Sequence, residues 1–92
     1  MTDEVIKLEG VLNIAKVDAM HTRLEKLVRN ATPVWISAQD VSRADTSILQ
    51  LLVVFFKQMA EQGNEVKWKG VSSEFVAAAK LLGLDKELKL DE

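Results

Sequence analysis

Cysteine is absent from this chain of 92 residues, and histidine occurs once, as His21. Without a thiol the chain can form no disulfide, no thiolate metal site and no cysteine nucleophile. A catalytic His21 would need a nearby nucleophile and an orienting acid, and no motif supplies them. We therefore expect His21 to be a half-exposed surface residue, and we expect no catalytic or metal site.

Glycine is also scarce, at positions 10, 63, 70 and 83, so the chain has no glycine-rich loop for binding phosphate. The longest apolar run, residues 51–56, is far shorter than the roughly 20 residues that span a bilayer. The acidic N-terminus lacks the features of a signal peptide, which predicts a cytoplasmic protein without direct membrane insertion. A net charge of −2 without a basic patch argues against nucleic-acid binding.

What is present is an alternation of strand-like and helix-like segments. Short apolar or alternating stretches predict strands at residues 5–9, 11–12, 34–36 and 66–70. Helical periodicity predicts helices at residues 14–29, 48–62 and 73–82, followed by a short turn that contains Leu84, Leu88 and Leu90. The order β-β-α-β-α-β-α predicts a single α/β domain over residues 1–92, with a mixed β-sheet of about four strands and three or four α-helices.

Local residue chemistry supports these boundaries. Asn13 and Ser72 or Ser73 are suited to cap helix starts, and Gly63 and Gly83 to end helices. The polar stretch at residues 37–47 predicts a turn after the strand at 34–36. Trp35 and Trp68 both fall at positions that we expect to face the core.

The segment Asp45-Thr46-Ser47 lies between this polar stretch and the apolar helix. The simplest interpretation is that Asp45 or Thr46 is the helix N-cap and accepts a hydrogen bond from a free amide. A phosphate on a hydroxyl here would be stabilised by the helix dipole, yet it would repel an acidic or apolar partner. Capping and phosphorylation can therefore use the same residue in two states.

The helix at residues 48–62 has an unusually narrow polar strip. Its apolar side is predicted to contain Ile48, Leu52, Phe55, Phe56 and Met59, and its polar side Gln50, Lys57 and Glu61. Val53 and Val54 flank the polar strip. They are either residues at the margin of the core or part of a protein-binding face.

The run at residues 41–49, after a buried strand and before an apolar helix, resembles the STAS family. Further similarities are Gly10 with Leu12, the sequence Gly63-Asn64-Glu65-Val66 with Gly70-Val71, and Leu81-Leu82-Gly83-Leu84. This family includes bacterial anti-sigma factor antagonists, tails of sulfate transporters and a subunit of a phospholipid-trafficking ABC system. The resemblance implies a STAS-like α/β fold over essentially the whole chain.

The resemblance also implies a non-catalytic switch that binds a nucleotide-binding protein, either an anti-sigma factor kinase or an ABC ATPase subunit. Asp45 would be the signature acid, Thr46 the phosphoacceptor and Ser47 a weaker acceptor. The lipid-transport branch is somewhat more similar, through residues 41–46, Gly70-Val71 and Ala79-Lys80-Leu81. The expected partner-binding residues are Asp45, Thr46, Ser47, Gln50, Val53, Val54 and Lys57, with no cofactor.

Two other functions remain open from the residues alone. A small anion or a nucleotide could bind at the start of the second helix, because the free amides of a helix N-terminus favour negative charge. A hydrolase that uses Ser47 as nucleophile is the weaker alternative, since the sequence offers no base for it.

Overall fold

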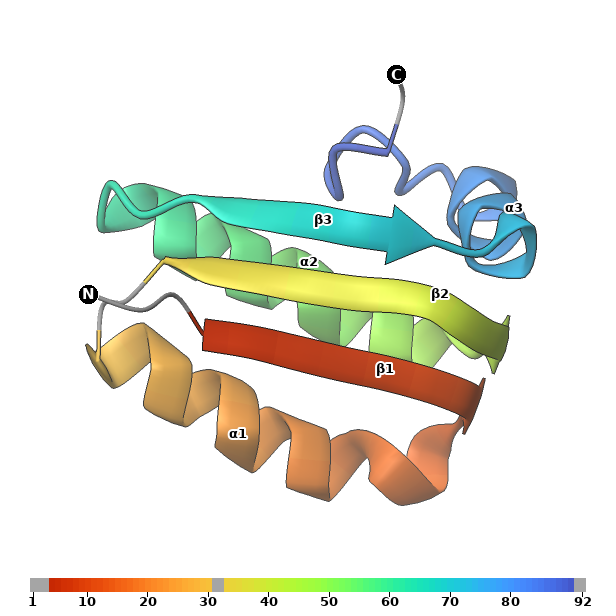
Figure 1. The fold of residues 1–92 in the computed structure, drawn as a ribbon, viewed down its shortest axis with the longest axis horizontal. Coiled ribbons are helices and arrows are strands. Elements are labelled where there is room, and N and C mark those ends of the chain that lie inside the picture. The colour runs from red at the N-terminus through yellow and green to blue at the C-terminus, as the bar shows by residue number, and fades with distance from the viewer. Residues whose placement is uncertain (1–3, 31–32, 91–92) are drawn as a thin grey trace.

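The computed structural model describes residues 4–30 and 33–90, and it confirms the α/β class. In these residues β1 (Glu4–Leu12), β2 (Val34–Ala44) and β3 (Val66–Val71) form one parallel sheet in the order β1-β2-β3 (Figure 1). The 3-10 turn η1 (Ile14–Lys16) and helix α1 (Val17–Asn30) connect β1 to β2. Helix α2 (Thr46–Glu61) connects β2 to β3, and α3 (Ser73–Leu81) follows β3.

The first strand is continuous, although the sequence predicted two strands in this region. Gly10 has a positive φ of 70°, and the pairing with β2 shifts register between Lys7 and Glu9 and again between Gly10 and Val11. Glycine adopts such a backbone without strain, so the strand bends and continues instead of ending. As a result, the described residues contain three parallel strands where we expected a mixed sheet of about four.

Strand β2 is longer than its apolar start suggested. The predicted turn at residues 37–47 is wrong over most of its length, because pairing continues as far as Ala44, which lies opposite Leu12. Ala38 and Val41 are 0% and 2% exposed, while the polar residues beside them face solvent. The polar residues of this stretch therefore belong to the solvent-exposed face of a strand.

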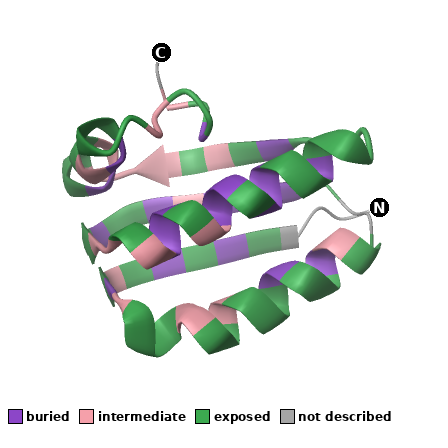
Figure 2. Ribbon diagram, turned by 180° about the vertical axis from the view of Figure 1, so that it is seen from behind, coloured by how far each residue is buried: buried purple, intermediate pink, exposed green. Residues whose placement is uncertain are grey.

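Helices α1 and α2 cover the same face of the sheet (Figure 2). The strands follow one another in the order β1-β2-β3, and both crossover connections have the same hand. The two crossover helices must therefore lie on the same face of the sheet. None of the described helices covers the opposite face, where Val5, Trp35 and Lys67 lie side by side in register. Val5 and Lys67 are exposed and Trp35 is half-buried, with the Lys67 ammonium 5.5 Å from its ring centroid. The prediction that Trp35 faces the core is wrong, since strand alternation gives the core positions to its neighbours.

Trp68 does face the core, as predicted. Its ring lies 5.6 Å from that of Phe56 and 5.3 Å from that of Phe75, measured between centroids. The indole N–H donates to the carbonyl oxygen of Leu88 at 2.7 Å, and Leu88 itself is fully buried. These contacts dock the final turn against the body of the domain, in agreement with the sequence pattern.

The predicted helix ends are also found. The Asn13 side chain accepts from the Ala15 amide at 3.1 Å before η1, and Ser72 accepts from the Phe75 amide at 3.0 Å before α3. Gly63 and Gly83 follow helices with φ of 78° and 71°. Within the described ranges, none of the helices combines the length and the apolar character that a membrane crossing requires.

Candidate functional site

The segments that follow the three strands meet at one edge of the sheet, because parallel strands all end on the same side (Figure 1). Such carboxyl edges are where open α/β sheets commonly bind their ligands. A shallow groove of about 540 Å³ lies here, and we call it the carboxyl-edge groove. Its lining residues are Ile14, Arg43, Ala44, Asp45, Thr46, Ser47, Ala78, Leu81 and Leu82.

The backbone of Asp45 fixes the start of α2. Its φ and ψ of −80° and 161° are extended, as expected for an N-cap residue. Its N–H donates to the Leu12 carbonyl oxygen at 2.9 Å, and its own carbonyl accepts from Ile48 at 3.1 Å and from Leu49 at 3.2 Å. The turn is therefore held from both sides by main-chain bonds, which place Thr46 at a defined point of the groove.

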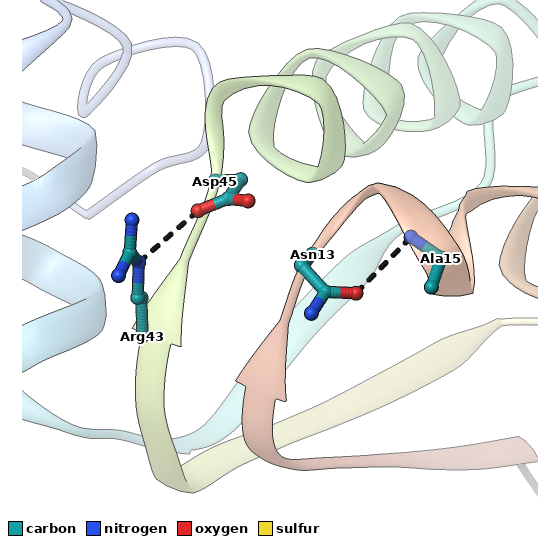
Figure 3. Close-up of polar contacts among 4 residues, drawn as sticks. All are labelled: Asn13, Ala15, Arg43 and Asp45. Atoms are coloured by element: carbon teal, nitrogen blue, oxygen red, sulfur yellow. Dashed lines mark hydrogen bonds and ion pairs between the residues drawn. The ribbon is translucent and has the colours of Figure 1, made fainter.

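The side chain of Asp45 does not act as predicted. It makes no capping hydrogen bond; instead, its Oδ1 lies 3.3 Å from Nε of Arg43 (Figure 3). Both side chains are partly solvated, at 74% exposure for Arg43 and 35% for Asp45, so the pair contributes little to stability. Asp45 is the N-cap by position, but its carboxylate is directed along the strand end, at the entrance of the groove.

Thr46 and Ser47 both line the groove, yet they differ in access. Thr46 is exposed, whereas Ser47 is half-buried. In the described part of the chain, neither hydroxyl takes part in a hydrogen bond. Thr46 thus presents a free hydroxyl to solvent at the first residue of a helix, and Ser47 is the less accessible of the two.

Three large apolar side chains share the groove with Thr46 and are exposed. Ile14 is 75% exposed, Leu81 is 87% and Leu82 is 41%. They come from η1 and from the end of α3, far from Thr46 in sequence, and all three line the same groove. Apolar residues gathered around a groove, rather than scattered singly, are typical of a surface that contacts another molecule.

The remaining predicted contact residues lie along α2. Gln50, Val54 and Lys57 are exposed, Val54 at 51%, and they form a surface strip that leads away from Thr46. Val53 is only 8% exposed and belongs to the core. Its side chain therefore offers almost no area to a partner, whereas that of Val54, about 100° further round the helix, points to solvent.

Sequence reasoning did not select Ile14, Leu81 and Leu82 as site residues. Leu81 could have been noticed, because it departs from the apolar face of α3 on which Phe75 and Ala79 are buried. Ile14 gave no such signal. Its place in the groove depends on the pairing of β1 with β2, which brings residues 12 and 44 opposite each other.

Catalytic and metal-binding chemistry finds little support in the geometry. His21 is exposed on α1, away from the groove-lining residues. Among the residues that the structure describes, no three histidine, aspartate or glutamate side chains are grouped so that they could hold a metal ion. The groove therefore offers hydroxyls, one ion pair and apolar side chains.

Comparison with known proteins identifies the family to which this fold belongs. The family model described as "Mlab, STAS domain" matches residues 1–91. The chain belongs to the STAS domain family. The family generally consists of regulatory domains that mediate protein–protein interaction. This membership confirms the resemblance that was seen in the sequence.

One similar solved structure is described as "Crystal Structure Analysis of Mglu". It has a TM-score of 0.63 and 19% sequence identity, and the match covers 75% of this chain but only 17% of that chain. At this identity the similarity concerns the fold alone. No curated protein matches the chain significantly.

Proposed function

We propose that this STAS domain is a non-catalytic protein-interaction switch. It docks a nucleotide-binding partner through the carboxyl-edge groove and the adjoining strip of α2, formed by Gln50, Val54 and Lys57. The observation that carries the proposal is that exposed Thr46 shares one groove with exposed Ile14, Leu81 and Leu82. Affinity would come from burying the apolar side chains, and control would come from Thr46.

The partner class follows from the family resemblance, not from the groove alone. An ABC ATPase subunit and an anti-sigma factor kinase both fit, because each is a nucleotide-binding protein bound by members of this family. The sequence around residues 41–46 is more similar to the lipid-transport branch, so the ATPase is the first candidate. In that setting the domain would support the ATPase by holding it in a productive arrangement.

Phosphorylation of Thr46 would switch the interaction off. A phosphate adds about −1.5 to −2 charges at neutral pH and binds water strongly. Placed among Ile14, Leu81 and the carboxylate of Asp45, this charge would have to be desolvated for a partner to dock. Ser47 is the weaker acceptor, because its half-buried position restricts access to a kinase.

The alternative is a module that binds a small anion or nucleotide at the start of α2. No observation favours it, since most of the groove-lining residues are apolar or uncharged and their one cation, Arg43, is already paired with Asp45. A free anion would have to compete with Asp45 for this guanidinium. We therefore retain protein docking as the function.

The test is a binding assay with three forms of the domain: wild type, Thr46→Ala and Thr46→Glu. The partner is first isolated on the wild-type domain and identified by mass spectrometry, and its affinity for each form is then measured by calorimetry. We expect a nucleotide-binding protein that binds the wild type and the alanine variant but is lost with Thr46→Glu.

Ser73→Glu is the matched control, since Ser73 is likewise an exposed hydroxyl residue at the first position of a helix. Equal affinities for all forms would mean that Thr46 has no part in docking. A partner without a nucleotide-binding site would contradict the partner class.

A further inference from the structure

A second hollow lies between β1 and α1, on the helix-covered side of the sheet, and its volume is about 280 Å³. We call it the β1–α1 cavity. Its floor is apolar and consists mainly of Ile6, Leu8, Leu12, Met20, Leu24 and Ile36. The strand residues of the floor are at most 6% exposed, so any ligand on this floor contacts the core of the domain.

The cavity exists because of the residues on one face of α1. Ala19, Met20, Arg23 and Leu24 line it from one face of α1, at spacings of three and four residues, and Lys16 lines it from the end of η1. Ala19, in the middle of this face, is too small to reach β1. The hollow is open to solvent at its rim, where Lys7, Lys16 and Arg23 are exposed, and it is closed at its base by buried strand residues.

The charges around the cavity are mainly positive. Lys7, Lys16 and Arg23 line it together with a single acid, Glu9. Lys7 is paired with Glu9 at 3.5 Å and with Asp40 at 3.8 Å, which neutralises its charge locally.

The other two cations are available to a ligand. Nη2 of Arg23 donates to the Val5 carbonyl oxygen at 3.4 Å, and in residues 4–30 and 33–90 no carboxylate forms an ion pair with Lys16 or Arg23. Lys16 at the end of η1 and Arg23 on α1 therefore lie beside the apolar floor without an acidic partner among the described residues.

We infer that the β1–α1 cavity binds a single molecule that combines a hydrocarbon chain with an anionic head group. An aliphatic carboxylate is the simplest such ligand. The hydrocarbon chain would lie on the floor beneath Ala19, and the carboxylate would meet Lys16 and Arg23 at the rim. An apolar cavity with a few convergent polar groups is the usual form of a small-molecule site. Charge-assisted hydrogen bonds from a guanidinium or an ammonium select an anionic head group.

This site is separate from the carboxyl-edge groove, since no residue lines both. The inference therefore does not depend on the proposed switch function. The two sites approach each other only at the end of β1, where Leu12 lies on the cavity floor and Ile14 on the groove.

The test is a titration of the whole domain with octanoate, in which binding is monitored by methyl NMR and by calorimetry. The Met20 methyl group reports on the cavity floor, and the fully buried Met59, which does not line the cavity, is the internal control. We expect saturable shifts of the Met20 signal with little change at Met59. Octanol should bind more weakly than octanoate, and octylammonium should not bind, because the rim is cationic.

Two variants locate the ligand. Ala19→Leu fills the cavity from an exposed helical position, where leucine is well tolerated, and should weaken octanoate binding about tenfold or more. Arg23→Gln should weaken it about two- to fivefold, the effect of one partly solvated charge pair. Lys26→Gln, which removes an exposed cation of α1 that does not line the cavity, is the matched control and should leave octanoate binding unchanged.

The inference would be overturned by any of three results. The first is the absence of saturable Met20 shifts at millimolar octanoate. The second is unchanged affinity in the Ala19→Leu variant when its circular dichroism shows a folded domain. The third is equal binding of octanoate and octylammonium, which would indicate unspecific adsorption to apolar surface.

Discussion

The main-chain N–H of Asp45 donates to the carbonyl oxygen of Leu12 at 2.9 Å, and this bond joins the start of α2 to the end of β1. The two residues are far apart in sequence but adjacent at the carboxyl edge of the sheet. The bond holds Thr46 next to the η1 turn that carries Ile14. The groove is therefore formed by the fold itself and does not require a partner to assemble it.

The helix starts of α2 and α3 should respond differently to loss of their N-cap side chains. Ser72→Ala removes the bond to the Phe75 amide and should lower the free energy of unfolding by about 1 kcal/mol. Asp45→Ala removes only a partly exposed pair with Arg43 and should cost about 0.5 kcal/mol or less. Urea denaturation of both variants measures the difference. A larger loss for Asp45→Ala would mean that its carboxylate caps α2 in solution.

Substitution of the two tryptophans should lower the free energy of unfolding by different amounts. Trp68→Phe deletes the bond to the Leu88 carbonyl and leaves this buried oxygen without a donor, which costs about 1–3 kcal/mol. Trp35→Phe alters a half-buried ring on the open face and should cost less than about 1 kcal/mol. Unfolding followed by circular dichroism, which does not depend on tryptophan fluorescence, gives both values. Similar losses would contradict the placement of the two rings on opposite faces.

The contrast between the tryptophans illustrates what the sequence could and could not predict. Helix positions, their caps and the buried face of α2 followed from local periodicity, because one amphipathic segment contains the whole signal. The face of Trp35 did not, since an unbroken apolar run at residues 34–36 has no alternation from which to choose a side. Likewise, the polar residues of β2 resemble a turn until their pairing with β1 is known.

For the site, the sequence singled out Asp45, Thr46 and Ser47, which lie on the carboxyl-edge groove, but it could not supply the rest of the groove. Whether they bind a partner remains a prediction. Ile14 and Leu81 reach the groove only through strand pairing and through the packing of α3, and both depend on contacts between distant segments. Val53 and Val54 were indistinguishable by composition, and the rotation of α2 on the sheet decides which one is buried.

Thr46→Glu should raise stability while it abolishes partner binding. An acidic side chain in the first turn of α2 interacts favourably with the helix dipole, which contributes about 0.3–1 kcal/mol at an exposed site. The same charge lies among the exposed apolar side chains of the groove and opposes docking. Thermal unfolding and calorimetric titration with the isolated partner measure the two effects. If stability and affinity both fell, the loss of binding would have to be attributed to damage to the fold.

Leu81→Asp tests the apolar part of the groove without touching Thr46. Leu81 is 87% exposed, so its replacement loses almost no core contact, and an acid near the end of α3 should lower stability by no more than about 1 kcal/mol. Partner affinity should nevertheless fall about tenfold or more, because truncating a central apolar contact commonly costs more than 1 kcal/mol of binding energy.

Lys80→Asp is the matched control for this substitution. This control changes the net charge twice as much as Leu81→Asp does. It does so at the neighbouring exposed position, which does not line the groove. Calorimetric titration of both variants with the isolated partner should show a large loss for Leu81→Asp and a small one for Lys80→Asp. Equal losses would mean that the partner responds to the overall charge of α3, and the groove would then have no specific role in docking.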